Sequence, residues 1–415
     1  MWEDSMLDLL KVDSLEEAIE KLYNECVNNH YSVDIEEIEV RDSLNRVLAA
    51  DVVSDIYVPE FDRSTVDGYA VIAKDTEGAN DSIPTFLNVV GESLMGKACE
   101  ISIKNGECVY VPTGGMLPEN ANACVMIEHT DNITDKKVAI YESVAEGKYV
   151  IKKGDDVKKD DVVLKKGHVI KAADMGFLSS INVNKIKVYK RLNITIISTG
   201  DELISDNETL TLGKIRDVNT NLLIGLSNKC GFNVIKTYLL KDDEELLKTT
   251  LDSSMNNSDI VVMSGGSSKG KKDASSKVID ELTSSGVLTH GIAIKPGKPT
   301  ITGYDNKTKT IVVGLPGHPV ASAILFKLIV VGVVQKLMGI EEKALVCEGI
   351  ISENMPASPG RTTFQLVNID DKFNVKPIYG RSGLIHTLSM ADGFIKMELN
   401  QEGINKGEKV KVYYL

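Results

Sequence analysis

Glycines, carboxylates and lysines follow successive apolar segments between residues 192 and 338. They lie in the segments STGDEL (198–203), KDDEE (241–245), SGGSSKGKKD (264–273), IKPGKP (294–299) and GLPGHP (314–319). Because ligands of open α/β sheets bind beyond the carboxyl ends of the strands, we expect these turns to share one edge of a sheet. Glycine turns and helix N-termini suit anions, lysines suit phosphate, and grouped carboxylates suit a hard cation such as Mg²⁺. The pattern therefore favours a phosphate ester that is bound together with magnesium.

Each of these turns also has a purely structural interpretation. GDEL can be a turn with a helix cap, and GLPGHP can be a tight turn before a helix, in which case His318 has no catalytic role. The segment Gly265 to Lys271 nearly fits the phosphate-loop pattern GxxxxGK followed by Ser or Thr, but Lys272 stands where that hydroxyl should be. We interpret it as an anion-binding turn and not as a true phosphate loop. The convergence of several such turns on one edge is what favours a ligand site.

A second polar stretch, FDRSTVDGYAV (61–71), places Asp62 and Asp67 directly before an apolar run that begins at Tyr69. Solubility alone could explain such a stretch in a surface loop. A buried strand behind a carboxylate would also hold it in a fixed direction, as a preorganised site requires.

The elements that position these motifs differ along the chain. Residues 14–28 have helical spacing, with Ser14 as the expected cap. Residues 52–150 contain short β-type runs separated by Gly, Asn and Asp, typical of a compact all-β module. Between 192 and 338 strands and helices alternate, which predicts a parallel sheet covered on both faces; its first helix is expected to have Asn219 as cap, and its last to span 319–338. After Gly339 the β pattern returns, as in a small barrel or sandwich.

Length and composition exclude several classes of protein. The chain has 415 residues, too long for one core, with 42% hydrophobic and 26% charged residues and a net charge of -13. This charge argues against binding of duplex nucleic acid, although not of a small anion. The acidic N-terminus is unlike a secretion signal, and the longest apolar run, 323–334, is shorter than the ~20 residues of a membrane span. We expect a soluble, cytoplasmic protein with no nucleic-acid or membrane partner.

The six cysteines are dispersed along the chain and include no CxxC pair. We expect them to behave as small buried hydrophobic residues and not as metal ligands.

In their order, the motifs resemble those of the molybdopterin molybdenumtransferase family, which includes MoeA and the E domain of gephyrin. The motifs are PEFDRSTVDGYAV, TGDEL, VNTNLL, SGGSSKGKKD, AIKPGKP and GLPGHPVAS. The resemblance implies a transferase of molybdenum cofactor biosynthesis that takes adenylylated molybdopterin and molybdate as substrates. It would hydrolyse the adenylate in a Mg²⁺-dependent step, release AMP and insert the metal. The resemblance also implies a homodimer whose clefts lie between subunits, with an adenylylating enzyme and molybdoenzyme recipients as further partners.

The resemblance divides the chain into an α/β multidomain fold. Residues 1–50 and 157–190 would form a discontinuous N-terminal domain, 51–156 an inserted all-β module, 191–338 a three-layer α/β molybdopterin-binding domain with a parallel-type sheet, and 339–415 a small C-terminal β-barrel. FDRSTVDGYAV would then lie at the rim of the inserted module, where it faces the α/β domain of the partner subunit. Asp67 would point into that shared cleft.

Matched motif by motif, the resemblance also implies the site residues. The catalytic residues would be Asp67, Glu202 and Asp273, and the magnesium ligands Asp156, Glu202, Asp242 and Asp273. The residues that bind molybdopterin or molybdate would be Thr113, Gly114, Ser264, Gly265, Gly266, Ser267, Lys295, Lys298, Pro316 and Pro319. Because molybdate is a dianion, lysines and backbone N–H groups suit it better than the carboxylates do.

This sequence departs from the family pattern at a few positions. Ile72 stands where the family often has Arg, His318 stands where Asn is common, and the glycine loop is basic at Lys269, Lys271 and Lys272. Two alternatives stay open, a tungstate-inserting paralogue and a non-catalytic molybdopterin-binding scaffold. The retained acidic positions favour the enzyme, since a scaffold gains nothing from carboxylates that repel one another.

Overall fold

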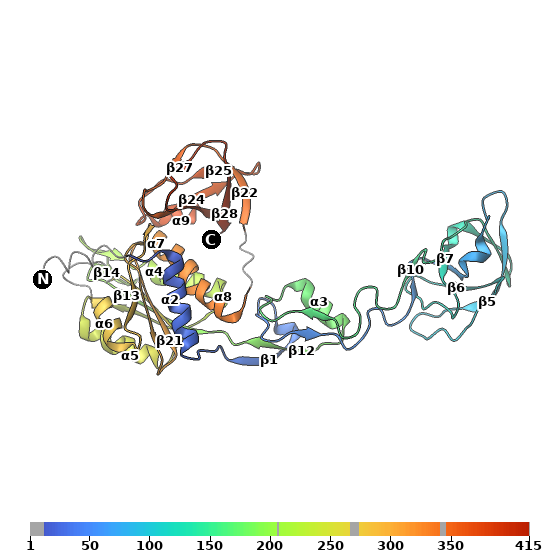
Figure 1. The fold of residues 1–415 in the computed structure, drawn as a ribbon, viewed down its shortest axis with the longest axis horizontal. Coiled ribbons are helices and arrows are strands. Elements are labelled where there is room, and N and C mark those ends of the chain that lie inside the picture. Colours follow the sequence, from blue (N-terminus) through green and yellow to red (C-terminus); the bar gives the residue numbers. More distant parts are fainter. Residues whose placement is uncertain (1–11, 206, 266–273, 341–345, 415) are drawn as a thin grey trace.

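The computed structural model describes residues 12–205, 207–265, 274–340 and 346–414. Figure 1 shows an elongated chain in which the α/β domain and the C-terminal barrel share one end, while the inserted module occupies the other. The narrow N-terminal domain lies between them. The predicted α/β multidomain fold, with its inserted all-β module and C-terminal barrel, is confirmed. The domain boundaries given above stay predictions.

A 6-stranded sheet forms the centre of the α/β domain. Its order is β16 (Asn233–Leu240), β13 (Asn193–Thr199), β17 (Ile260–Ser264), β21 (Thr310–Leu315), β20 (Ile301–Asp305) and β18 (Val287–His290). The strands from β16 to β21 run parallel, as predicted. β20 runs antiparallel to β21, and β18 antiparallel to β20, so the sheet is mixed at that side. Because β18 again points the same way as β21, the chain leaves both strands at the same edge.

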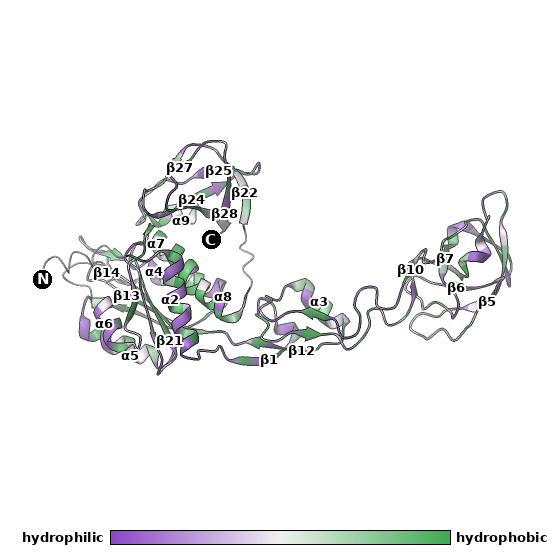
Figure 2. Ribbon diagram, in the orientation of Figure 1, coloured by the Kyte–Doolittle hydropathy of each residue, from purple (hydrophilic) through white to green (hydrophobic). Residues whose placement is uncertain are grey.

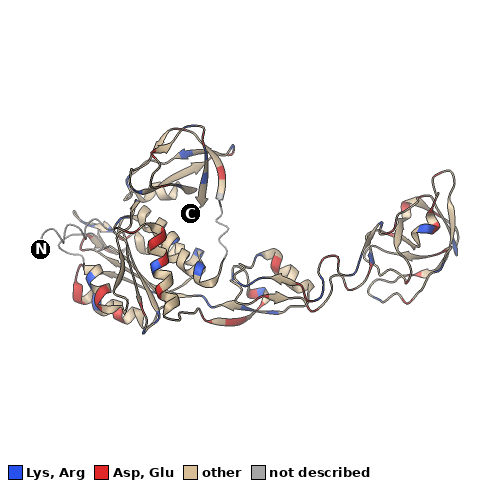
Figure 3. Ribbon diagram, in the orientation of Figure 1, with Lys and Arg blue, Asp and Glu red and all other residues tan. Residues whose placement is uncertain are grey.

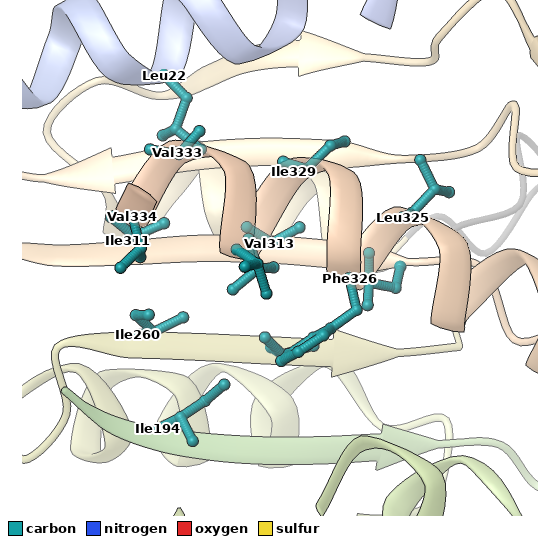
Figure 4. Packing of buried hydrophobic residues seen from close by; sticks show 14 of the residues in the cluster. Leu22, Ile194, Ile260, Ile311, Val313, Leu325, Phe326, Ile329, Val333 and Val334 are labelled. Carbon is teal, nitrogen blue, oxygen red and sulfur yellow. The ribbon is translucent and has the colours of Figure 1, made fainter. Parts of the chain in front are cut away.

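Helices cover both faces of this sheet (Figure 1). One face carries α2 (Leu15–Asn28), α4 (Asn219–Lys229) and the helix that begins at Pro319; the other carries α5 (Glu244–Met255) and α6 (Ala274–Leu282). A separate hydrophobic cluster fills the space on each side of the sheet. Figure 4 shows the first cluster, in which Phe326 of the long helix points towards the strands that carry Val313 and Ile260. The result is the three-layer arrangement that the alternating pattern predicted.

The N-terminal helix α2 begins as the sequence predicted. Ser14 Oγ accepts the N–H of Glu17 at 3.1 Å, and Glu17 Oε2 accepts the N–H of Ser14 at 2.7 Å. This reciprocal capping box pairs backbone donors that the helix itself cannot pair. Leu15 and Leu22 lie on the face that packs against the α/β core.

The start of α4 differs from the prediction. Asn219 is the first helical residue and does not cap the helix. Val218 occupies the N-cap position, and Asp217 Oδ1, one residue earlier, accepts the N–H of Asn219 at 3.0 Å and that of Thr220 at 3.1 Å. The predicted cap is wrong because the Asn219 side chain is turned towards other turns of the domain.

The predicted helix over 319–338 is present as α7 (Pro319–Leu325), a π-helical turn (Phe326–Val331) and α8 (Gly332–Met338). By length and composition alone, these 20 residues could span a membrane. Most of them are buried in the α/β core instead, where they pack against α2, α4 and β21. This segment is therefore a core helix.

The N-terminal domain is assembled from both sides of the insertion. Its strands β1 (Ile35–Glu39) and β12 (Lys185–Tyr189) pair antiparallel, and its helix α3 (Ala172–Ser180) follows the insertion. Its core combines Leu48, before the insertion, with Ile170 and Leu178 after it. A 3₁₀ turn (Val40–Asp42) follows β1.

The inserted module contains a second 6-stranded sheet, in the order β7-β4-β6-β5-β9-β8. The bounds are β4 (Gly68–Val71), β5 (Thr85–Glu92), β6 (Glu107–Val111), β7 (Ala123–Met126), β8 (Thr130–Thr134) and β9 (Lys137–Ile140), with 3₁₀ turns at Ala73–Thr76 and Ile127–His129. Short ladders connect the module to the N-terminal domain: β2 (Val52–Val53) with β11 (Val162–Leu164), and β3 (Arg63–Ser64) with β10 (Val150–Ile151). The polar strand β8 was not predicted, because its residues lack an alternating apolar pattern.

The C-terminal domain is a barrel and not a sandwich. Its strands are β22 (Val346–Ile351), β24 (Thr362–Ile369), β25 (Asn374–Pro377), β26 (Gly393–Met397) and β28 (Lys409–Tyr414), with β23 (Met355–Pro356), β27 (Gly403–Ile404) and α9 (Ile385–Ser389) outside this ring. The ring closes because β26 pairs with both β28 and β24. Phe364 and Phe394 belong to the same hydrophobic cluster as the α/β domain, so the two domains share a core.

Hydropathy and charge follow these cores. Figure 2 shows hydrophobic residues concentrated in the central strands and in α7 and α8. Figure 3 shows acidic and basic residues in every part of the molecule.

Three of the cysteines match the prediction. Cys26, Cys108 and Cys124 are buried, and burial raises the pKa of the Cys26 and Cys108 thiols to about 12 and that of the Cys124 thiol to about 11. These thiols stay neutral near pH 7 and pack as hydrophobic side chains. Cys230 is exposed and departs from the prediction.

Candidate functional site

The predicted site residues fall into two groups, which belong to domains at opposite ends of the elongated molecule (Figure 1). The inserted module carries one group, and its linker to the N-terminal domain adds Asp156. The edge of the α/β domain carries the other group. Gly266, Ser267, Asp273 and the lysines 269, 271 and 272 lie outside the described residues.

On the inserted module, Asp67 is tied to the turn after β6. Its Oδ1 accepts the N–H of Thr113 at 2.7 Å. The next residue, Gly114, donates its N–H to Ser64 O at 2.8 Å and has a φ of 82°, which favours glycine. Behind Asp67, a Cβ on Gly68 would lie 1.9 Å from Val125 O, so the strand leaves room for glycine only. Asp67, Thr113 and Gly114 therefore form one fixed rim, with Asp67 and Thr113 exposed.

The other carboxylate of the FDRSTVDGYAV stretch has a different partner. Asp62 Oδ1 accepts the N–H of Lys153 at 2.8 Å, and Asp62 O accepts the N–H of Leu117 at 2.9 Å. The Lys153 turn leads to Asp156, which is exposed and donates its N–H to Val58 O at 3.0 Å. Asp62 thus shapes the turn that presents Asp156.

At the α/β edge, Glu202 and Asp242 are exposed carboxylates that follow β13 and β16. The position of a Cβ on Gly200 would lie 2.8 Å from Glu202 Oε2, so the Glu202 side chain folds back over Gly200. Asp201 Oδ1 accepts the N–H of Asp242 at 3.2 Å. This bond joins the two acidic turns. The small ladder of β14 (Leu203–Ile204) with β15 (Ile215–Arg216) continues from the first of them.

The turns after β17 and β21 approach each other backbone to backbone. Gly265 has a φ of 102°, and its N–H donates to Leu315 O at 3.4 Å. A Cβ on Gly265 would lie 2.2 Å from Thr199 O, at the end of β13. The predicted residues Pro316 and Pro319 are buried in this region, and Pro319 is the first residue of α7. The edge therefore brings together the ends of β13, β17 and β21, as the sequence predicted.

The lysine turn follows β18, as expected, but its own strand does not join the α/β sheet. Ile294–Lys295 is a short strand, β19, that pairs with β24 of the barrel and not with the α/β sheet. Lys295 and Lys298 are both exposed, and Lys295 Nζ donates to Ser358 Oγ at 2.7 Å. The barrel thus holds one of the two lysines.

The barrel also contacts the turn after β21. His318 Nδ1 lies 2.8 Å from Ser382 Oγ, and Val320 donates its N–H to Ser382 O at 3.1 Å. The sequence did not predict Ser358 or Ser382, because neither lies in a motif. Ser358 lies 63 residues after Lys295 in the sequence, and Ser382 lies 64 residues after His318.

Magnesium fits the acidic turns only together with a ligand. Within the described ranges, no group of at least 3 His, Cys, Asp or Glu side chains could hold a metal ion by itself. Mg²⁺ usually takes one or two carboxylates and completes its shell with water and substrate phosphates. Glu202 and Asp242 supply that kind of incomplete set. The edge as a whole suits a ligand with both a phosphate and a further anionic group.

Three family models match the chain in sequence. Residues 13–182 match the MoeA N-terminal region (domain I and II), residues 195–336 the probable molybdopterin binding domain, and residues 348–415 the MoeA C-terminal region (domain IV).

Solved structures of MoeA share the fold. Two structures of the molybdopterin biosynthesis MoeA protein of Pyrococcus horikoshii are similar to this chain. One is 34% identical with a TM-score of 0.76, over 97% of this chain and 99% of that chain. The other is 29% identical with a TM-score of 0.81, over 98% of this chain and 100% of that chain.

Relatives resemble the chain over nearly its whole length. It is 29% identical to the molybdopterin molybdenumtransferase of Haemophilus influenzae, over 92% of this chain and 94% of that protein. It is 36% identical to a putative molybdopterin biosynthesis protein of Methanocaldococcus jannaschii, over 98% of both. With these matches and the three family models in their expected order, the chain belongs to the MoeA family.

Proposed function

We propose that this protein inserts molybdate into adenylylated molybdopterin and releases AMP in a Mg²⁺-dependent step. The observation that supports this most is the edge of the α/β domain, at which acidic turns follow β13 and β16, glycine turns follow β17 and β21, and a lysine turn follows β18. A ligand with a phosphate ester and a second, separate anion needs this combination of charges. The relatives of the same family support the reaction.

The acidic and the basic residues of the edge have separate roles in this proposal. Glu202 and Asp242 would hold Mg²⁺ against the phosphates of the substrate. When bound, the ion neutralises phosphate charge during hydrolysis of the adenylate. Lys295 would attract molybdate, and its bond to Ser358 fixes the direction of the ammonium group.

The inserted module would complete the cleft from a second subunit. Asp67 is held by the N–H of Thr113, so its charge has a fixed position before any ligand binds. In a single chain the inserted module, which carries this rim, lies at the end of the molecule opposite to the α/β domain, which carries Glu202 (Figure 1). A two-fold dimer can bring the rim of one subunit to the edge of the other. We therefore propose a homodimer with composite sites that acts in the cytoplasm.

The direct test supplies adenylylated molybdopterin with Mg²⁺ and either molybdate or tungstate, and follows AMP release and formation of the metal cofactor. We expect both products with molybdate, and loss of AMP release when a chelator removes Mg²⁺. Faster insertion of tungstate than of molybdate would assign the protein to the tungstate-inserting alternative. Binding of molybdopterin without AMP release under any condition would contradict the proposed reaction and favour a scaffold.

A further inference from the structure

Asn219 lies where the strand-ending turns of the α/β domain meet. It is the first residue of α4, and only 7% of its surface is exposed. Its Nδ2 donates to Ser264 Oγ at 2.7 Å and to Gly317 O at 2.7 Å. Ser264 ends β17, and Gly317 belongs to the turn between β21 and α7. One amide group therefore ties two of the turns that form the proposed site.

Asn219 is also connected to a third strand, through Asp217. Asp217 Oδ1 accepts the N–H of Asn219 at 3.0 Å, and also the hydroxyl of Ser198 at 3.3 Å. Thr220 donates its hydroxyl to the other oxygen of Asp217. Because Ser198 belongs to β13, the Asn219 side chain is fixed relative to β13, β17 and β21 together.

The side-chain amide of Asn219 also sets the direction of the Ser264 hydroxyl. The Nδ2 of Asn219 is only a donor, so the oxygen of Ser264 must accept in that bond. The hydrogen of the Ser264 hydroxyl then points elsewhere, as a donor. Ser264 precedes Gly265, whose backbone has no room for a Cβ. A fixed donor at this position suits an anionic or carbonyl oxygen of a ligand.

The side-chain oxygen of Asn219 indicates that a contribution to stability alone does not explain why asparagine occupies this position. Asn219 Oδ1 is buried and has no hydrogen-bond partner within the part of the chain that the structure describes. An unpaired buried acceptor destabilises a fold. What the position uses is the pair of N–H donors, and these act only on Ser264 and Gly317.

We propose that Asn219 is a positioning residue for ligand binding. It keeps the Ser264 hydroxyl as a donor and holds the turns of Gly265 and Gly317 in register. It acts through Ser264 and Gly317 and need not touch the ligand. The proposal rests on the proposed function, because the ligand of this edge would be adenylylated molybdopterin.

The test is the substitution Asn219→Asp, which keeps the shape of the side chain but removes both N–H donors. Ser264 would then donate to the carboxylate, and Gly317 O would lose its donor. We expect KM for adenylylated molybdopterin to rise about tenfold or more, with little change in kcat, because binding is lost and not chemistry. A purely structural role would instead reduce the amount of folded enzyme, which lowers kcat and leaves KM unchanged.

A second readout does not depend on turnover. The pterin fluorescence of molybdopterin reports Kd directly, and Asn219→Asp should raise this Kd by a similar factor. Asn228→Asp is the matched control, because Asn228 is exposed near the other end of α4, and we expect it to change neither KM nor Kd. If Asn219→Asp does not fold, Asn219→Ser, which keeps one donor, takes its place in the same measurements.

The coupling with Ser264 decides the mechanism. In a double-mutant cycle, the effects of Asn219→Asp and Ser264→Ala should be less than additive, because both changes remove the Ser264 donor and only the loss of the Gly317 bond is separate. Fully additive effects, or an unchanged Kd in Asn219→Asp, would overturn the proposal. Binding without AMP release in the unsubstituted protein would count against the proposed function, while the Kd values would still decide the role of Asn219.

Discussion

At the scale of single residues, Asp62 and Asp67 show how similar carboxylates acquire different roles. Each accepts a backbone N–H through Oδ1, Asp62 from Lys153 and Asp67 from Thr113. Asp62 shapes a turn of the linker, whereas Asp67 lies on the exposed rim beside Gly114. Their residue type alone could not separate these roles, because the partner of each lies far away in the sequence. The pair therefore offers a matched comparison.

We predict that Asp67→Asn reduces AMP release roughly 10²-fold, as for the loss of one preorganised electrostatic contact. Asparagine keeps an oxygen that can accept the N–H of Thr113, so the change removes charge and preserves the rim. Asp62→Asn is the control and should leave AMP release close to normal. Normal turnover in Asp67→Asn, or an equal loss in both variants, would remove Asp67 from the mechanism.

At the scale of elements, the sequence predicted what local pattern determines. Long periodic segments such as α2 and the helix over 319–338 lie close to their predicted positions. The cap of α4 was wrong because tertiary partners, Ser264 and Gly317, bind the Asn219 side chain. Lys295 follows β18 in the chain, but its own short strand pairs with the barrel. Pairings between distant segments leave no local pattern, so the sequence could not show that Ser358 holds this lysine.

The capping box of α2 gives a prediction for one element. Ser14→Ala removes the acceptor for the N–H of Glu17 and should destabilise the start of the helix by about 1 kcal/mol. Hydrogen–deuterium exchange of a peptide that covers residues 12–28 should become faster. Ser253→Ala, at an exposed position within α5, is the control and should be neutral or slightly stabilising. Equal protection of the α2 peptide in Ser14→Ala and in the unsubstituted protein would show that packing alone fixes this helix.

At the scale of the whole molecule, the elongated shape separates the two halves of the proposed site. The inserted module, which carries Asp67, and the α/β domain, which carries Glu202, lie at opposite ends of the molecule, with the N-terminal domain between them (Figure 1). The barrel, in contrast, shares a core with the α/β domain and contributes Ser358 and Ser382 within the same chain. If the proposed site combines the rim with the edge, the inserted module must come from a second subunit, whereas the barrel can come from the same chain.

Complementation between two inactive variants tests this arrangement most directly. Asp67→Ala and Glu202→Ala are each expected to be inactive, and they are mixed under conditions that exchange subunits. If each cleft combines the rim of one subunit with the edge of the other, a mixed dimer has one cleft with both changes and one with neither. With random exchange, half of the dimers are mixed, so about a quarter of all clefts should release AMP. No recovery of AMP release, although mass-tagged subunits prove exchange, would mean that each site is built within one chain.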